Sequence, residues 1–225
     1  MPTILLIRHG QASYGTDDYD RLSDAGHAQA AAIAGELARR RPSIERVVHG
    51  SLRRQSETAA PTLEALSLAA TIDPRLDEYD MDEIVAGHTD SSVRTNAPRS
   101  GQPVSSGEFQ RVLELGMSAW IDAAEGSRCA ETWPAFATRC SAGLAAAAAG
   151  LTSGSTAVVF TSAGVIAALC CSLLGLPPKT LIPLNRVAVN AGLTKVASGR
   201  SGLSLVSFNE HGYLEGAGGG LVTLR

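Results

Sequence analysis

Near its amino end the chain reads Ile4-Leu5-Leu6-Ile7-Arg8-His9-Gly10. Four consecutive apolar residues, without the alternation of a half-exposed strand, are typical of a parallel strand that is covered on both faces. A polar turn follows, and then a helix for which Ser23 is the expected N-cap and whose apolar stripe runs to Leu37. This opening predicts an α/β fold whose first strand lies inside the sheet.

The alternation of strands and helices continues along the chain. The pattern predicts strands at 46–49, 157–161, 188–197 and 203–208, helices at 108–124 and 133–149, and further helices after the strands at 46–49 and 157–161. Such an order is typical of an α/β fold with a mainly parallel sheet. Ligands of such folds bind beyond the carboxyl ends of the strands, so we examine the residues that follow each strand.

Composition is that of one globular domain, and we expect it to span residues 1–225. The chain has 225 residues, of which 44% are hydrophobic and 18% charged, with no internal repeat and no linker. Residues 80–107 are polar and lack a period, which predicts a long, lid-like excursion over the surface. The alanine-rich stretch at 142–149 is expected to pack either internally or in a homodimer.

Charge and cysteine content exclude several classes of partner. The 19 basic residues nearly balance the 22 acidic ones, so we expect neither nucleic acid nor a membrane surface as a partner. The four cysteines lack the spacing of zinc, redox or haem sites and are expected to be buried thiols. The amino end lacks the features of a signal peptide and the apolar tracts are too short to span a bilayer, which predicts a cytoplasmic protein.

Three clusters carry candidate chemistry. Arg8-His9-Gly10 ends the first strand, Arg54 lies near the start of the helix after the second strand, and Glu78 opens the polar excursion. Taken singly, each has an ordinary alternative: a hydrogen-bonded histidine, a solvated arginine pair, a solvated acidic pair. Their order, with each cluster beside a strand end, favours a site for an anion that combines an imidazole, two guanidiniums and a carboxyl group.

The motifs RHG at 8–10, L-S-x-x-G-x-x-Q-A at 22–30, L-x-R-x-x-x-T-A at 52–59 and L-x-E at 76–78 resemble the histidine phosphatase superfamily, also called the phosphoglycerate mutase-like family. The resemblance extends to about residue 175 and implies a three-layer α/β/α sandwich. It further implies that His9 forms a phosphohistidine, that Glu78 donates a proton, and that no metal or cofactor takes part. Phosphate contacts are implied for Arg8, Arg54, Gly10 and Gln11.

One departure from the family pattern concerns its second histidine, which normally stands in a run such as V-x-S-H-G-G. Here the run is Val159-Phe160-Thr161-Ser162-Ala163-Gly164, so Ser162 takes the place of the histidine and is assigned to the phosphate pocket. Loss of one preorganised donor costs on the order of 10² to 10³ in rate, which weakens a phosphatase without abolishing it. Gly15 is a second departure, at a position where many relatives have asparagine.

The leading hypothesis is a metal-independent phosphomonoesterase that acts on a small-molecule phosphate ester. A phosphate-binding relative with little turnover is the alternative, and a phosphomutase ranks third. His49 or His211 is a candidate to replace the missing histidine, whereas His27 and His88 receive no role. Arg94 and Arg99, in the polar excursion, are candidates to contact a second anionic group of a substrate.

Overall fold

The computed structural model describes residues 1–13, 20–40, 42–88, 106–216 and 220–224, apart from the side chains of 106 and 109. Its central sheet has the strand order β3-β2-β4-β1-β5-β6. The strands are β1 (Thr3–Arg8), β2 (Ser43–His49), β3 (Ala70–Ile72), β4 (Ser155–Thr161), β5 (Leu193–Gly199) and β6 (Gly202–Glu210). Strands β3, β2, β4 and β1 are parallel to one another, and β5 is antiparallel to both of its neighbours, β1 and β6. The prediction of a mainly parallel sheet is confirmed.

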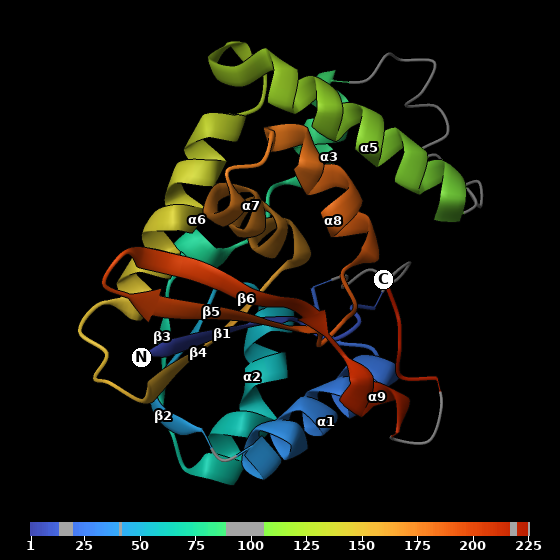
Figure 1. Ribbon diagram of the computed structural model, residues 1–225. Coiled ribbons are helices and arrows are strands. Elements are labelled where there is room, and N and C mark those ends of the chain that lie inside the picture. Colours follow the sequence, from blue (N-terminus) through green and yellow to red (C-terminus); the bar gives the residue numbers. More distant parts are fainter. Residues whose placement is uncertain (14–19, 41, 89–105, 217–219, 225) are drawn as a thin grey trace.

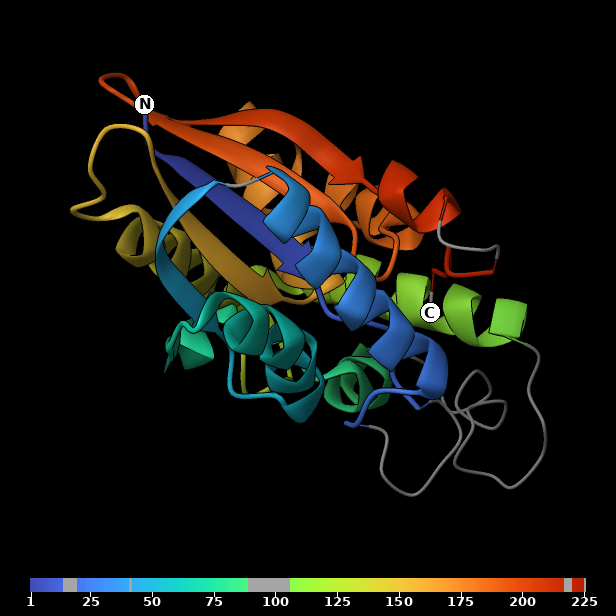
Figure 2. The same cartoon turned by 90° about the horizontal axis from the view of Figure 1, so that it is seen from below.

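Helices cover both faces of this sheet, as Figures 1 and 2 show. They are α1 (Asp24–Arg40), α2 (Arg53–Leu66), α3 (Met81–His88), α5 (Ser106–Ala123), α6 (Trp133–Ala148), α7 (Ala163–Leu174), α8 (Leu181–Val187) and α9 (Gly212–Glu215). Leu5 and Ile7 of β1 pack in the apolar cluster that includes α1 and α2, whereas Ile4 and Leu6 pack in the cluster that includes α6 and α7. The first strand is therefore buried on both faces, and the fold is an α/β/α sandwich.

Near the amino end of the chain, the elements beside the site agree with those predicted from the sequence. Further along the chain, one of the predicted elements differs. Ser23 caps α1 as expected, because the backbone N–H of Gly26 donates to its Oγ at 3.1 Å. The strand expected from residue 188 is wrong at its start, since β5 begins only at Leu193. Residues 188–192 instead form a buried turn in which the N–H of Gly192 donates to the carbonyl of Val189 at 2.9 Å.

The polar excursion expected at 80–107 is wrong at both ends. Asp80 caps helix α3, since its Oδ1 accepts from the N–H of Glu83 at 2.8 Å, and Ile84 and Val85 anchor that helix in the core. Helix α5 already begins at Ser106. Residues 89–105, which include Arg94 and Arg99, lie outside the described residues, as does Gly15. The lid therefore stays a prediction.

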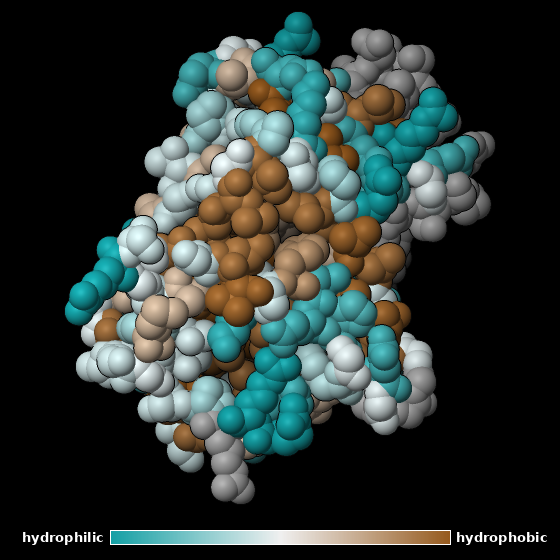
Figure 3. All heavy atoms as spheres, viewed as in Figure 1, coloured by the Kyte–Doolittle hydropathy of each residue, from teal (hydrophilic) through white to brown (hydrophobic). Residues whose placement is uncertain are grey.

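The structure also bears on the predictions made for the cysteines, for a membrane and for a homodimer. All four cysteines are buried with free thiols, as predicted. In the part of the chain that the structure describes, no helix is long and apolar enough to cross a membrane. Figure 3 shows an apolar area over α7 and β6, two elements that carry the exposed side chains of Leu174 and Val206. The homodimer stays a prediction.

Candidate active site

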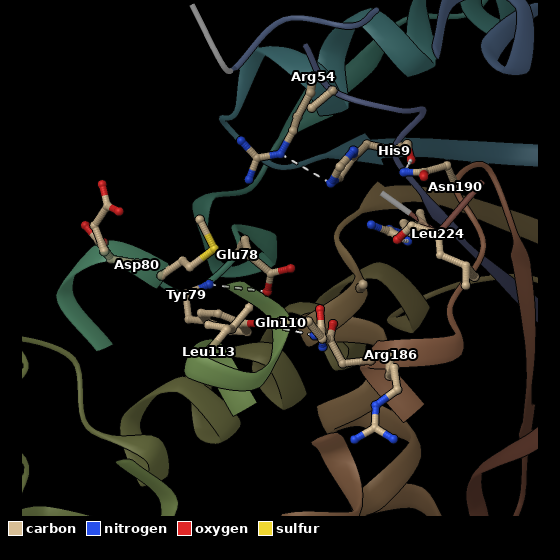
Figure 4. A pocket seen from close by; sticks show the side chains of 16 residues that line it. His9, Arg54, Glu78, Tyr79, Asp80, Gln110, Leu113, Arg186, Asn190 and Leu224 are labelled. Atoms are coloured by element: carbon tan, nitrogen blue, oxygen red, sulfur yellow. Dashed lines mark hydrogen bonds between the residues drawn. The ribbon is translucent and has the colours of Figure 1, made fainter. Parts of the chain in front are cut away.

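The carboxyl ends of the parallel strands bring distant segments together around one cavity. His9 directly follows β1, Arg54 lies in the first turn of α2 after β2, and Ala163 opens α7 after β4. Glu78 follows the short 3-10 turn Pro74–Leu76 that comes after β3. Figure 4 shows His9, Arg54 and Glu78 around a common cavity, which has a volume of about 460 Å³. Arg8 lines it as well.

The hydrogen bonds of His9 fix which ring nitrogen carries the proton. Nδ1 lies 2.7 Å from the carbonyl oxygen of Gly10, and because a carbonyl can only accept, Nδ1 is the protonated nitrogen. Nε2 accepts from Nε of Arg54 at 3.2 Å. The lone pair of Nε2 is therefore the one that faces the guanidinium of Arg54.

Burial lowers the pKa of His9 well below its ordinary value, and the positive charges of Arg54 and Arg8 lower it further. The ring is only 5% exposed, so an imidazolium would lose most of its hydration. His9 is thus neutral near pH 7, which is the protonation state that a nucleophile requires.

Arg54 is held by an acid on its other side. Its Nη1 lies 2.6 Å from Oδ1 of Asp20, and Oδ2 of Asp20 also accepts from the N–H of Arg53 at 2.8 Å. The backbone of the helix is tied to the end of β1, because Oγ1 of Thr58 donates to the carbonyl of Arg54 and accepts from the N–H of Gly10. These bonds fix the guanidinium relative to His9.

Arg8 is oriented by the carboxyl-terminal segment 221–224. Its Nη1 donates to the carbonyl oxygens of Ala188 and of Leu224, the latter at 3.0 Å. Asn190 supports the same corner, since its Nδ2 donates to the carbonyl of His9 at 3.2 Å and its Oδ1 accepts from Oγ1 of Thr223 at 2.9 Å. Sequence reasoning missed Asn190 and Leu224, because neither lies in a motif and Asn190 fell inside an expected strand.

The carboxyl group of Glu78 is held by backbone N–H groups. Its Oε2 accepts from the N–H of Gly164 at 3.0 Å and its Oε1 from the N–H of Tyr79 at 3.3 Å. Burial raises the pKa of this carboxyl, against the opposing influence of these bonds and of the two arginines. A Cβ at position 164 would collide with Oε1 of Glu78, which explains the glycine there. A carboxyl group with a raised pKa is suited to donate a proton to a leaving oxygen.

Ser162 lies where the sequence pattern expects it, at the end of β4, but it does not line the cavity. Its side chain is 0% exposed, and its Oγ accepts from Nε2 of Gln55 at 2.9 Å. Gln55 also donates to the carbonyl of Leu76 at 3.1 Å. Ala163, the next residue, lines the cavity in its place. The geometry therefore gives Ser162 a structural partner rather than a phosphate contact.

Gly10 and Gln11 likewise lie outside the cavity lining. A Cβ on Gly10 would come within 2.6 Å of the carbonyl oxygen of Gly26, so the glycine is required by contact with α1 rather than by a ligand. The side chain of Gln11 accepts from Oγ of Ser23 at 2.8 Å. Of the seven expected site residues, the structure brings together His9, Arg8, Arg54 and Glu78.

Among the described histidines, His9 alone lines the cavity. Nδ1 of His49 lies 2.6 Å from the carbonyl of Gly50, and Nδ1 of His211 lies 2.6 Å from that of Asn209. His88 bonds to Oγ of Ser127, and His27 is exposed on α1. The expectation that His49 or His211 replaces the missing histidine gains no support from this geometry.

The far wall of the cavity was not predicted from the sequence. It comes from the segment after Glu78, from α5 and from α8, and its residues are Tyr79, Asp80, Met81, Asp82, Gln110, Leu113, Asn185 and Arg186. Tyr79, Asp80, Met81 and Asp82 lie in or beside α3, a helix inside the expected irregular excursion. Gln110 and Leu113 lie in α5, which agrees with the helix expected at 108–124. The sequence pattern did not identify α3 as a helix, and for this reason it did not place residues 79–82 at the cavity.

Comparison of the sequence with known proteins gives a family match and a related protein. A family model described as histidine phosphatase superfamily (branch 1) matches residues 4–211. A glucosyl-3-phosphoglycerate phosphatase of Mycolicibacterium vanbaalenii is 32% identical over 181 residues, which cover 77% of this chain and 75% of that protein.

Two solved structures share the fold. A mycobacterial glucosyl-3-phosphoglycerate phosphatase in complex with inorganic phosphate has a TM-score of 0.65 and 24% identity, covering 94% of this chain and 98% of that one. A phosphoserine phosphatase of Entamoeba histolytica in complex with 3-phosphoglyceric acid has a TM-score of 0.62 and 17% identity, covering 95% and 99%.

Proposed function

Because this chain belongs to the histidine phosphatase superfamily, we propose that it is a phosphatase that hydrolyses small-molecule phosphate monoesters through a phosphohistidine at Nε2 of His9. The observation that carries the proposal is the pairing of a neutral His9 with Arg54, 3.2 Å from Nε2, in a cavity that Arg8 and Glu78 also line. These groups supply a nucleophile, two cations and an acid.

In the first step, Nε2 of His9 attacks phosphorus, a P–N bond forms and the P–O bond to the alcohol breaks. Glu78 gives its proton to the leaving oxygen, which therefore departs as a neutral alcohol. The guanidiniums of Arg8 and Arg54 stabilise the charge that spreads over the three equatorial oxygens. Arg54 is already adjacent to Nε2, so a phosphoryl group that reaches His9 also reaches this cation.

In the second step, water attacks the phosphorus of the phosphohistidine. Glu78, now a carboxylate, takes a proton from this water, and the P–N bond breaks to return a neutral His9 and inorganic phosphate. The bond from Nδ1 to the carbonyl of Gly10 keeps the imidazole in one orientation through both steps. The reaction splits one difficult displacement into two that use the same groups.

A phosphate-binding protein with little turnover is the second candidate, and Ser162 motivates it. The hydroxyl of Ser162 is buried and does not line the cavity, so this position offers no donor to a phosphoryl oxygen. Absence of one preorganised donor is expected to slow the reaction on the order of 10² to 10³. We therefore expect a slow phosphatase rather than an inactive one.

The test measures hydrolysis of p-nitrophenyl phosphate and of a panel of metabolite phosphates by the wild type and by His9→Ala. We expect the variant to lose at least about 10³ in kcat, since removal of a nucleophile leaves only binding contributions. His49→Ala is a matched control, because His49 is also a buried histidine at a strand end with Nδ1 bonded to a glycine carbonyl, yet it lies outside the cavity.

Unchanged turnover in His9→Ala would refute the proposed function. If phosphate raises the Tm of the wild type while none of the esters is hydrolysed, the binding protein is the correct description. Equal losses in the two histidine variants would show that the effect is structural.

A further inference from the structure

The far wall of the cavity, where the alcohol part of a substrate would lie, is rigid and partly apolar. Its apolar members are Tyr79, Met81 and Leu113. The ring of Tyr79 is fixed by contact with the rings of Phe136 and Trp120, at centroid distances of 5.7 and 5.8 Å. Its hydroxyl accepts from Nδ2 of Asn185 at 3.3 Å. This wall offers a flat aromatic surface and two amide side chains, of Asn185 and Gln110.

Two carboxyl groups stand beside this apolar surface. Asp80 and Asp82 both line the cavity, and both residues are exposed. The N–H of Glu83 donates to Oδ1 of Asp80 at 2.8 Å, which fixes this carboxylate at the start of α3. Figure 4 shows Asp80 on the side of the cavity remote from His9. A negative group on the alcohol part of a substrate would meet these two charges.

The cation on the far wall is engaged elsewhere. Nε of Arg186 donates to Oε1 of Glu114 at 2.7 Å and its Nη2 to Oε2 at 2.5 Å, a two-bond pair that occupies the fork of the guanidinium. Nε2 of Gln110 donates to the same Oε1 at 2.6 Å. Figure 4 shows the guanidinium of Arg186 directed away from His9. Glu114 thus holds Arg186 away from an anion in the cavity.

Among the described residues, the positive charge that faces the cavity is therefore concentrated at the phosphate end, on Arg8 and Arg54. We infer that this phosphatase prefers phosphate esters of uncharged, partly apolar alcohols, such as phenols, and discriminates against esters whose alcohol part carries a carboxylate or a second phosphate. Asp80 and Asp82 disfavour the extra anion, and Glu114 withholds Arg186 from it. The inference rests on the proposed function and names its substrate class.

The test compares kcat/KM for phenyl phosphate and for 4-carboxyphenyl phosphate, two esters that differ by one carboxylate. The carboxylate makes the phenol a slightly better leaving group, so slower hydrolysis of that ester reports repulsion in the cavity. We expect its kcat/KM to be lower by about tenfold, the ratio that corresponds to about 1.4 kcal/mol. In the double variant Asp80→Asn/Asp82→Asn, we expect the kcat/KM values of the two esters to differ by less than threefold.

Glu114→Gln supplies an independent readout, because it releases Arg186 without adding or removing a group in the cavity lining. We expect this variant also to reduce the difference between the kcat/KM values of the two esters. Asp122→Asn is the matched control: it removes an exposed acid that pairs with Lys179 outside the cavity, and it should leave the ratio unchanged.

A wild-type kcat/KM that is equal or higher for 4-carboxyphenyl phosphate would overturn the inference while leaving the proposed function intact. A ratio that neither set of variants changes would refute the roles of Asp80, Asp82 and Glu114. If neither ester is hydrolysed while p-nitrophenyl phosphate or a metabolite phosphate is, the inference fails and the proposed function stands. If none of these esters is hydrolysed, the proposed function fails and the inference falls with it.

Discussion

Nε of Arg54 donates to Nε2 of His9 across 3.2 Å, and this one bond joins the helix after β2 to the residue after β1. It orients the imidazole from the side opposite to the bond between Nδ1 and Gly10. The charge of Arg54 also helps to keep the pKa of His9 low. The orientation of His9, the proposed nucleophile, and in part its protonation state thus depend on the same guanidinium that is expected to bind the phosphoryl group.

The opposite pKa shifts of His9 and Glu78 predict a bell-shaped dependence of kcat/KM on pH. The pKa of His9 lies well below 6.5, so its neutral form is lost only on the acid side of that value. The pKa of Glu78 is raised above 4.5, so its proton is retained to higher pH and its loss produces the alkaline limb. In Glu78→Gln the alkaline limb should disappear.

The same variant tests the role of Glu78 as an acid. Loss of a general acid costs about 10² to 10⁴ in rate when the leaving group is a poor one, and less for p-nitrophenyl phosphate, whose phenolate needs little protonation. Steady-state kinetics on an alkyl phosphate and on p-nitrophenyl phosphate measures both effects. An alkaline limb that persists in Glu78→Gln would assign it to another group.

Replacement by alanine of two glycines in α1 should change the free energy of unfolding in opposite directions. A Cβ on Gly26 would collide with the carbonyl oxygen of Gln11, whereas a Cβ on Gly35 meets nothing within 4 Å. We expect Gly26→Ala to lower the free energy of unfolding by about 1 to 3 kcal/mol, because two backbones must separate. Gly35→Ala should raise it by about 0.5 to 1 kcal/mol, the usual gain of alanine in a helix. Urea denaturation tests this; equal effects at both sites would contradict the close approach of α1 to the site.

Ser162→Ala should affect stability more than turnover. It removes the acceptor that Nε2 of Gln55 uses at 2.9 Å, which leaves that amide its bond to the carbonyl of Leu76. We expect a loss of about 1 kcal/mol in the free energy of unfolding and a change in kcat of less than about tenfold. A fall of 10² or more in kcat at unchanged stability would mean that Ser162 contacts the phosphoryl group.

Deletion of residues 221–225 should weaken both the fold and the site. The deletion removes the acceptors that Gln29 finds at Leu221 and Thr223 and the carbonyl of Leu224 that holds Arg8. We expect a lower Tm and a lower kcat/KM for phosphate esters, because Arg8 loses a partner that orients it. Val222→Ala is the control, since this exposed side chain belongs to the same segment. An unchanged kcat/KM after deletion would show that the carbonyl of Leu224 is not needed to orient Arg8.

The sequence allowed prediction of the elements whose signal is local. Strand β1 was recognisable from its apolar run and helix α1 from its N-cap and apolar periodicity, because these signals lie within the elements themselves. His9, Arg8, Arg54 and Glu78 were found because each lies beside a strand end and in a family motif.

The remainder depends on tertiary contacts. The requirement for glycine at position 10 comes from Gly26, which the linear pattern does not connect to it. Helix α3 has only eight residues and two buried apolar side chains, too short a stretch for a helical period to stand out. Asn190 acts from a turn whose path is set by bonds to Thr223 and His9, so its place in the site follows only from the folded chain.

The most direct test of the account is to mix the enzyme with ³²P-labelled ester, quench within milliseconds and examine the protein for bound phosphate. The account predicts a phosphoenzyme that is stable in alkali and lost in acid, as a phosphoramidate is, with the label on the peptide that contains His9 and absent from His9→Ala. Turnover of the ester without any such label, or an acid-stable label on another residue, would contradict it.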